Sequence, residues 1–117
     1  MKEYLSDFQQ LAIDSASDTK AFDILILDLR NRSDLTDYFM ICSGNSKVHV
    51  QSIADAILEK CYQNHNRPMA VEGYTGGIWV VLDLADLIVH VFHKEARLHY
   101  DLERLWGDVP VIQAIGK

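Results

Sequence analysis

The chain has 117 residues, 49% of them hydrophobic, and this size and composition indicate one globular domain rather than two domains or a disordered chain. Its net charge is −6, with 11 basic residues against 17 acidic ones, which disfavours direct nucleic-acid binding and favours a basic partner. The longest apolar run, residues 78–82, is too short to span a bilayer, and the N-terminus lacks the layout of a signal peptide. Cys42 and Cys61 fit buried thiols, so we expect a cytoplasmic protein with no membrane partner.

Apolar periodicity predicts three helices and five strands in the order α-β-β-α-β-β-β-α. The helices carry apolar residues at three- and four-residue spacing, and they cover about residues 4–19, 46–65 and 94–106. The second of them is capped by Asn45 or Ser46. The strands cover residues 22–29, 38–42, 69–72, 78–83 and 87–92. Because a strand–helix–strand connection favours a parallel crossover, this order predicts an α/β (α+β) fold, a mixed five-stranded sheet with helices packed on it.

We expect residues 1–106 to form the domain and residues 107–117 to be a loosely held tail. The first two strands are apolar on both faces, which predicts that both sides of the sheet are covered. In the last helix the leucines should face inward, namely Leu98, Leu102 and Leu105. Arg97 and Asp101 should form an exposed i,i+4 ion pair.

The hairpin of the last two strands has two unlike faces. One is aliphatic, with Ile78, Val80, Leu82, Leu87, Val89 and Val91. The other is mixed, with Trp79, Val81, Asp83, Asp86, Ile88, His90 and Phe92. A two-residue turn at Leu84–Ala85 would place Trp79 opposite His90, and a register shift of two residues would keep both on one face. The mixed face is either a protein-binding surface or a surface covered by the first or last helix, and both interpretations stay open.

The turn from Ser43 to Ser46 (SGNS) could offer backbone N–H groups to a phosphate, which makes a nucleotide-using enzyme the alternative hypothesis. Such an enzyme also needs paired acids on neighbouring strands to hold magnesium, and no D-x-D or D-x-E lies on a predicted strand after the second helix. We therefore interpret the turn as a bend at Gly44 followed by a helix cap. The histidines near the C-terminus lack the spacing of a metal site, so neither a metal nor a cofactor is expected.

Four segments of the chain, in order from about Leu5 to Trp106, resemble one family. They are DYFMICSGNS with the following HVQSIAD, then WVVLD, IVHVF and RLHYDLERLW. Each segment alone is weakly specific, but the four in order resemble the ribosomal silencing factor family (RsfS, also called Iojap-like).

This resemblance implies a translation factor that is not an enzyme, with a nucleotidyltransferase-like fold that lacks the catalytic acids. Family members bind the large ribosomal subunit through ribosomal protein fourteen, block its joining to the small subunit, and repress translation when nutrients are short. They often form homodimers. The expected partner-binding residues are Trp79, Asp83, Ile88, His90, Phe92, Arg97, Tyr100 and Glu103. Trp79, Asp83 and His90 match the family's W-V-V-L-D and V-H-V pieces, and Arg97, Tyr100 and Glu103 match its R-x-x-Y-x-L-E piece, whereas Ile88 and Phe92 are added because they share the mixed face of the hairpin.

Overall fold

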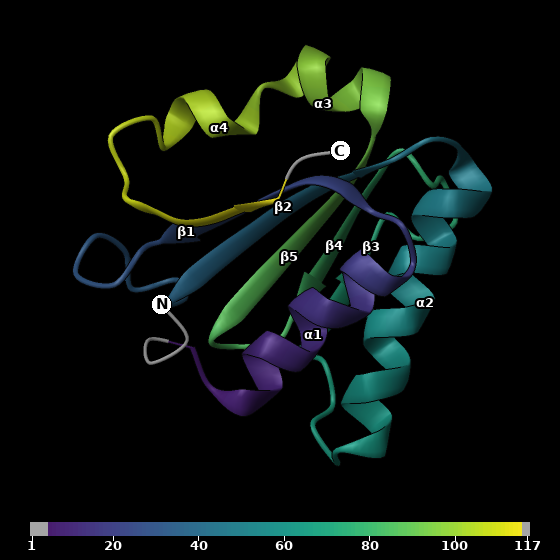
Figure 1. Cartoon of the computed structure of the whole chain (residues 1–117), viewed down its shortest axis with the longest axis horizontal. Helices are drawn as coiled ribbons and strands as arrows, with labels where there is room; N and C mark the ends of the chain where they lie inside the picture. Colours follow the sequence, from purple (N-terminus) through teal and green to yellow (C-terminus); the bar gives the residue numbers. More distant parts are fainter. Residues whose placement is uncertain (1–4, 116–117) are drawn as a thin grey trace.

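A mixed sheet of six strands lies between two layers of helices in the computed structural model, which describes residues 5–115 (Figure 1). The strands lie side by side in the order β3-β4-β5-β2-β1-β6. β2 and β5 are parallel, and the other neighbouring pairs are antiparallel. The strands are β1 (Phe22–Asp28), β2 (Tyr38–Gly44), β3 (Ala70–Glu72), β4 (Trp79–Asp83), β5 (Leu87–His93) and β6 (Val111–Ile115).

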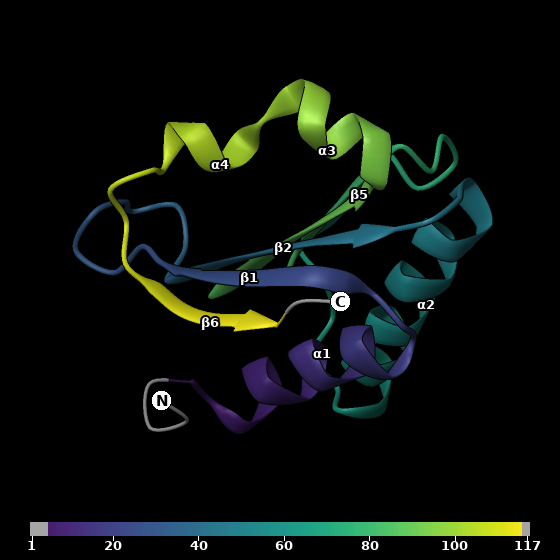
Figure 2. The same ribbon diagram turned by 45° about the horizontal axis from the view of Figure 1, so that its top comes forward.

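Two long helices, α1 (Asp7–Asp18) and α2 (Lys47–Gln63), cover one face of the sheet (Figure 2). The hydroxyl oxygen of Ser46 accepts a hydrogen bond from the backbone N–H of His49 at 3.1 Å, which confirms the predicted cap of α2. The first large core cluster lies between these helices and the sheet and includes Ala12, Ile13, Ala16, Ile24, Ile26, Met40, Cys42, Ile53, Ile57, Val80, Leu82, Val89 and Val91.

Two short helices, α3 (Lys94–Tyr100) and α4 (Leu102–Leu105), cross the opposite face of the sheet (Figure 2). We call residues 94–105 the α3–α4 segment. A second, smaller core cluster includes Leu27, Leu29, Phe39, Ile41, Ile88, Phe92, Leu102 and Val109. The sheet is thus covered on both faces, as its doubly apolar strands predicted. Within residues 5–115, no helix has the length and apolar character needed to cross a membrane.

The prediction of one continuous helix over residues 94–106 is wrong. The helix breaks at Asp101, whose backbone is left-handed, with φ 49° and ψ 49°. Leu98 is 83% exposed and Leu105 is 75% exposed, so of the three leucines expected in the core only Leu102 is buried. Apolar spacing counted across a break assigns residues to the wrong face, because the break changes the helical phase.

The predictions of a five-stranded sheet and a loosely held C-terminal tail are also wrong. β6 pairs antiparallel with β1, with Ile24 opposite Ile115 and Leu27 opposite Val111. The backbone N–H of Asp28 donates to the carbonyl of Pro110 at 2.9 Å, and Val109 is buried in the second cluster. A short edge strand forms because β1 offers it an unpaired edge, and the tail's own sequence does not reveal that edge.

The hairpin turn lies one residue later than predicted, at Ala85–Asp86, where Leu84 N–H donates to the carbonyl of Leu87 at 2.9 Å. Every opposing pair therefore shifts by two residues, and Trp79 lies opposite Phe92 instead of His90. An even shift leaves each side chain on its predicted face, so the division into an aliphatic and a mixed face holds for the strands. Ile78 is the exception, since it precedes β4 and is 54% exposed.

A matched pair of valine substitutions tests whether the C-terminal residues are part of the fold. Val109→Ala should lower the free energy of unfolding by about 1–2 kcal/mol, because Val109 is buried. Val111→Ala should change it by no more than about 0.5 kcal/mol, because Val111 is half exposed. Urea denaturation measures both. Equal and negligible effects of the two substitutions would restore the prediction of a loose tail.

Candidate functional site

Four aromatic side chains form a contiguous row on the mixed face of the β4–β5 hairpin, and we call Trp79, His90, Phe92 and Tyr100 the aromatic row. Trp79 is central: its ring centroid lies 4.9 Å from that of Phe92, 4.9 Å from that of Tyr100 and 6.0 Å from that of His90. Phe92 and His90 are buried, whereas Trp79 is half-buried and Tyr100 is 51% exposed. The α3–α4 segment, and not α1, covers this face, and it leaves one margin of the row accessible.

His90 is held as a neutral imidazole within the row. The indole N–H of Trp79 donates to His90 Nδ1 at 3.1 Å, which places the imidazole proton on Nε2. Burial lowers the pKa of His90 to about 4. Nε2 is buried and has no hydrogen-bond partner within residues 5–115, and the ring packs edge-to-face against Phe39 at 4.7 Å between centroids. His90 therefore orients Trp79 through a bond that requires the uncharged ring.

Asp83 and Ile88 lie opposite each other near the far end of the hairpin. Ile88 is buried in the second core cluster, whereas Asp83 is half-buried and accepts a hydrogen bond from the backbone N–H of Ala85 at 2.9 Å. Four residues along a strand span roughly 13 Å, so the structure does not bring Asp83 next to Trp79. Asp83 and Trp79 lie at opposite ends of β4 on the mixed face.

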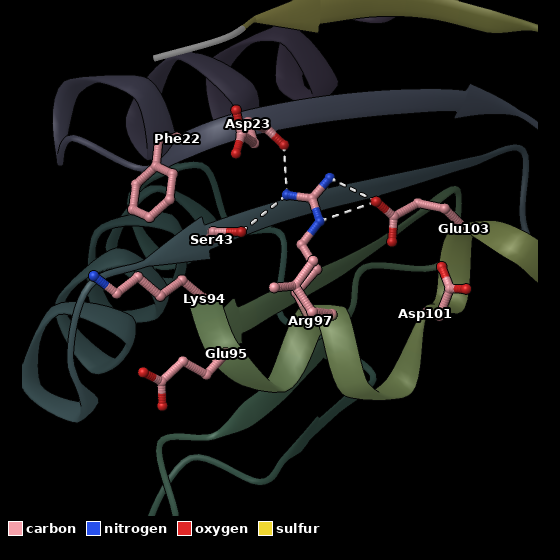
Figure 3. Close-up of a pocket in the computed structure, with 9 residues that line it drawn as sticks. Phe22, Asp23, Ser43, Lys94, Glu95, Arg97, Asp101 and Glu103 are labelled. Carbon is pink, nitrogen blue, oxygen red and sulfur yellow. Dashed lines mark hydrogen bonds and ion pairs between the residues drawn. The ribbon is translucent and has the colours of Figure 1, made fainter.

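Arg97 makes contacts that the sequence did not predict (Figure 3). Its Nη1 donates to the backbone carbonyl of Asp23 at 2.6 Å and to Ser43 Oγ at 2.9 Å. Its Nε and Nη2 lie 3.1 Å and 3.0 Å from Glu103 Oε2. The predicted ion pair with Asp101 is wrong, because the break after α3 turns Glu103 toward the guanidinium instead.

An open cavity of about 630 Å³ borders the Arg97 side chain, between the start of β1, the end of β2 and the α3–α4 segment (Figure 3). Its lining is Phe22, Asp23, Ser43, Lys94, Glu95, Arg97, Leu98, Asp101 and Glu103. The part that Asp23 plays could not be predicted from its side chain, since it contributes a backbone carbonyl.

Three of the four residues in the turn from Ser43 to Ser46, namely Ser43, Asn45 and Ser46, form hydrogen bonds with other parts of the protein. Besides the Ser43 and Ser46 bonds, the backbone N–H of Asn45 donates to Nδ1 of His49 at 2.9 Å. Nε2 of His49, which therefore carries the proton, lies 2.8 Å from the carbonyl of Thr19 at the end of α1. Gly44 provides space rather than a special bend, because a Cβ there would lie 3.0 Å from Val50 Cγ2 and 3.3 Å from His49 Nδ1.

Side chains suited to metal or nucleophilic chemistry are dispersed. Within residues 5–115, no group of three or more His, Cys, Asp or Glu side chains is placed to hold a metal ion. Nδ1 of His93 accepts from the backbone N–H of Glu95 at 3.2 Å, and the ring of His99 packs against Tyr100. Burial raises the pKa of the Cys42 thiol to about 12, which keeps it protonated and unreactive.

Comparison with known proteins gives a consistent result. A family model described as "Ribosomal silencing factor during starvation" matches residues 3–116. A Bacillus subtilis protein named "Ribosomal silencing factor RsfS" is 44% identical over 102 residues, covering 87% of this chain and 86% of that protein. The protein of the same name from Halalkalibacterium halodurans is 40% identical over 107 residues, covering 92% of each. A crystal structure of a Chromobacterium violaceum protein superposes with a TM-score of 0.83 at 32% identity, covering 86% of this chain and 84% of that one.

Gly44→Ala should lower the free energy of unfolding by about 1–2 kcal/mol, because the added methyl group would press on Val50 and His49. Gly76→Ala is the matched control, since a Cβ there meets no atom nearer than 3.8 Å, and it should change the value by less than about 0.5 kcal/mol. Chemical denaturation compares the two variants. Similar stabilities would contradict the close approach of α2 to the end of β2.

The buried His90 should make stability depend on pH. Its pKa in the folded protein is about 4, against an ordinary value of 6.5, so the unfolded chain binds more protons between these pH values. The free energy of unfolding should therefore rise by up to about 3 kcal/mol from pH 4 to pH 6.5 on account of this group, and then level off.

His90→Asn removes the titrating ring, and its pH dependence should be shallower than that of the wild type by this amount. Urea denaturation at several pH values measures both curves, and the difference between them isolates His90 from the carboxylates. Parallel curves would mean that the pKa of His90 is close to its ordinary value.

Proposed function

The chain belongs to the ribosomal silencing factor family, as its sequence resemblance indicated, and we propose that it acts without catalysis by binding the large ribosomal subunit. In this proposal its partner is ribosomal protein fourteen, and the bound protein sterically blocks association with the small subunit and represses translation in the cytoplasm under nutrient limitation. The family match supports the ribosomal context. The observation that supports protein docking is the accessible margin of the aromatic row.

The proposed docking surface consists of Trp79, Tyr100 and Asp83 on the mixed face, together with the exposed leucines of the α3–α4 segment, Leu98 and Leu105. Aromatic side chains that are partly exposed and rigidly packed from below are typical of interface hot spots. The α3–α4 segment is short, yet it exposes three large apolar side chains, Leu98, Tyr100 and Leu105, and such exposed apolar area is available to a partner.

The eight residues expected to bind the partner divide by exposure. Ile88, His90 and Phe92 are buried, so we propose that they support the surface from below. Trp79, Tyr100 and Asp83 are accessible enough to touch a partner. Arg97 binds Glu103 and the sheet, so its role differs from that of an exposed contact residue.

The net charge of −6 supports a protein partner over ribosomal RNA. Ribosomal proteins are generally basic, so an acidic factor is attracted to them and repelled by the surrounding phosphates. The nucleotide-using alternative has less support, because three polar groups of the Ser43–Ser46 turn, namely Ser43 Oγ, the Asn45 N–H and Ser46 Oγ, are already bonded within the chain. The homodimer implied by the resemblance stays a prediction.

Trp79→Ala and Tyr100→Ala should each weaken binding to purified large subunits by about tenfold or more, because both remove aromatic contact area at the accessible margin of the row. Co-sedimentation at fixed salt measures the dissociation constants. Tyr62→Ala is the matched control, since Tyr62 is a 57% exposed aromatic residue on α2, on the opposite side of the sheet, and its removal should leave binding unchanged.

Circular dichroism and urea denaturation establish that each variant is folded. Folded Trp79→Ala and Tyr100→Ala variants that bind like the wild type would exclude this docking surface. The wider proposal is tested by light scattering of the two ribosomal subunits, which should associate less when wild-type protein is in saturating excess. Unchanged association under those conditions would overturn it.

A further inference from the structure

Two strained residues lie on either side of the Arg97 guanidinium. Asp23, in β1, has φ 50°, and the pairing of β1 with β2 shifts register at this point. Asp101, between α3 and α4, has φ 49°. Residues other than glycine adopt this left-handed conformation at an energetic cost, so the surrounding structure must compensate for it.

The irregular backbone at Asp23 and at Asp101 allows two of the partners of Arg97 to reach its guanidinium (Figure 3). The irregularity at Asp23 presents that residue's carbonyl to Nη1 at 2.6 Å. The break at Asp101 brings Glu103 to the other side of the guanidinium, at 3.0 Å. In an unbroken helix, residues six positions apart point about 120° away from each other, so the Arg97–Glu103 pair requires the break.

The guanidinium compensates for weak apolar packing of α3. This helix has seven residues, and none of them is buried. The Arg97 side chain, by contrast, is only 11% exposed, and its charge-assisted bonds reach β1, β2 and α4. The apolar packing of α3 is limited to partly buried or exposed side chains such as Ala96 and Tyr100, so the four donor contacts of Arg97 add the constraint that fixes the rotation of α3 about its own axis.

The rotation of α3 determines where Tyr100 lies. Tyr100 is three residues after Arg97, on the adjacent turn, and its ring lies 4.9 Å from that of Trp79. We propose that Arg97 is a positioning residue rather than a contact residue: it fixes the α3–α4 segment on the sheet and so holds Tyr100 against Trp79. For its effect on docking, this inference rests on the function proposed above.

Arg97→Lys tests the inference, because lysine keeps the charge but cannot bind two strands and Glu103 at once. Arg104→Lys is the matched control, since Arg104 lies on the same segment and its pair with Asp101, at 3.6 Å, is exposed. Arg97→Lys should increase amide hydrogen exchange across residues 97–103 about tenfold or more, with exchange in α2 unchanged. It should also weaken binding to large subunits about tenfold, whereas Arg104→Lys should match the wild type in both measurements.

A rescue experiment separates positioning from general destabilisation. Arg97→Ala should regain part of its binding when guanidinium ion is added at low millimolar concentration, and methylammonium at the same concentration should not restore it. Glu103→Ala is the substitute variant if the Arg97 variants fail to fold, because Glu103 is partly exposed. It removes two of the four contacts of the Arg97 guanidinium, so hydrogen exchange and binding should change in the same direction as in Arg97→Lys but by less.

Wild-type exchange rates in residues 97–103 of Arg97→Lys would overturn the inference, and so would faster exchange with unchanged binding. These results are distinct from failure of the proposed function, in which the wild type itself would not bind large subunits. That failure would also overturn the docking part of this inference.

Discussion

The two parallel strands at the centre of the sheet, β2 and β5, are buried along almost their whole length, and the other elements are arranged around that burial. A strand buried on both faces requires a layer of side chains on each side, because exposed apolar area destabilises the fold by roughly 25 cal/mol per Å². On one face this layer comes from α1 and α2, whose apolar stripes are long enough to form it. On the other face it comes from the much shorter α3–α4 segment.

The unequal size of the two layers explains where a surface for a partner remains. The α3–α4 segment packs against Phe92 but leaves Trp79 half-buried at its margin. Because so short a segment buries little apolar area, a polar network around Arg97 fixes its position. The same short segment leaves Leu98 and Leu105 exposed. Its small size therefore accounts for both the accessible part of the aromatic row and the apolar side chains on the outer side of the segment.

The turn between β2 and α2 has the composition of a phosphate site, and its side chains hold parts of the fold together. Its serines and its glycine would suit an anion at a helix N-terminus. Here Ser46 caps the helix, Ser43 accepts from Arg97, and His49 links the turn to the end of α1. These bonds connect both helical layers to the end of β2, which is a sufficient reason for the polar residues to be there.

The sequence by itself determined the order of the helices and strands as far as residue 93, the two faces of the hairpin and the family, and it narrowed the cap of α2 to Asn45 or Ser46. These properties follow from local periodicity, from capping chemistry and from short motifs, all of which act over a few neighbouring residues. The hairpin register was misplaced by two residues, yet its faces were right, because an even shift preserves the alternation of side chains.

Only the tertiary structure decided the sixth strand, the break at Asp101 and the role of Arg97. β6 depends on an unpaired edge of β1, some 85 residues earlier in the chain. The Arg97 site depends on a backbone carbonyl at Asp23 and a hydroxyl at Ser43, which are 74 and 54 residues away. Interactions between groups so far apart in the chain leave no periodic trace in the sequence, so they become visible only when the sheet brings those groups together.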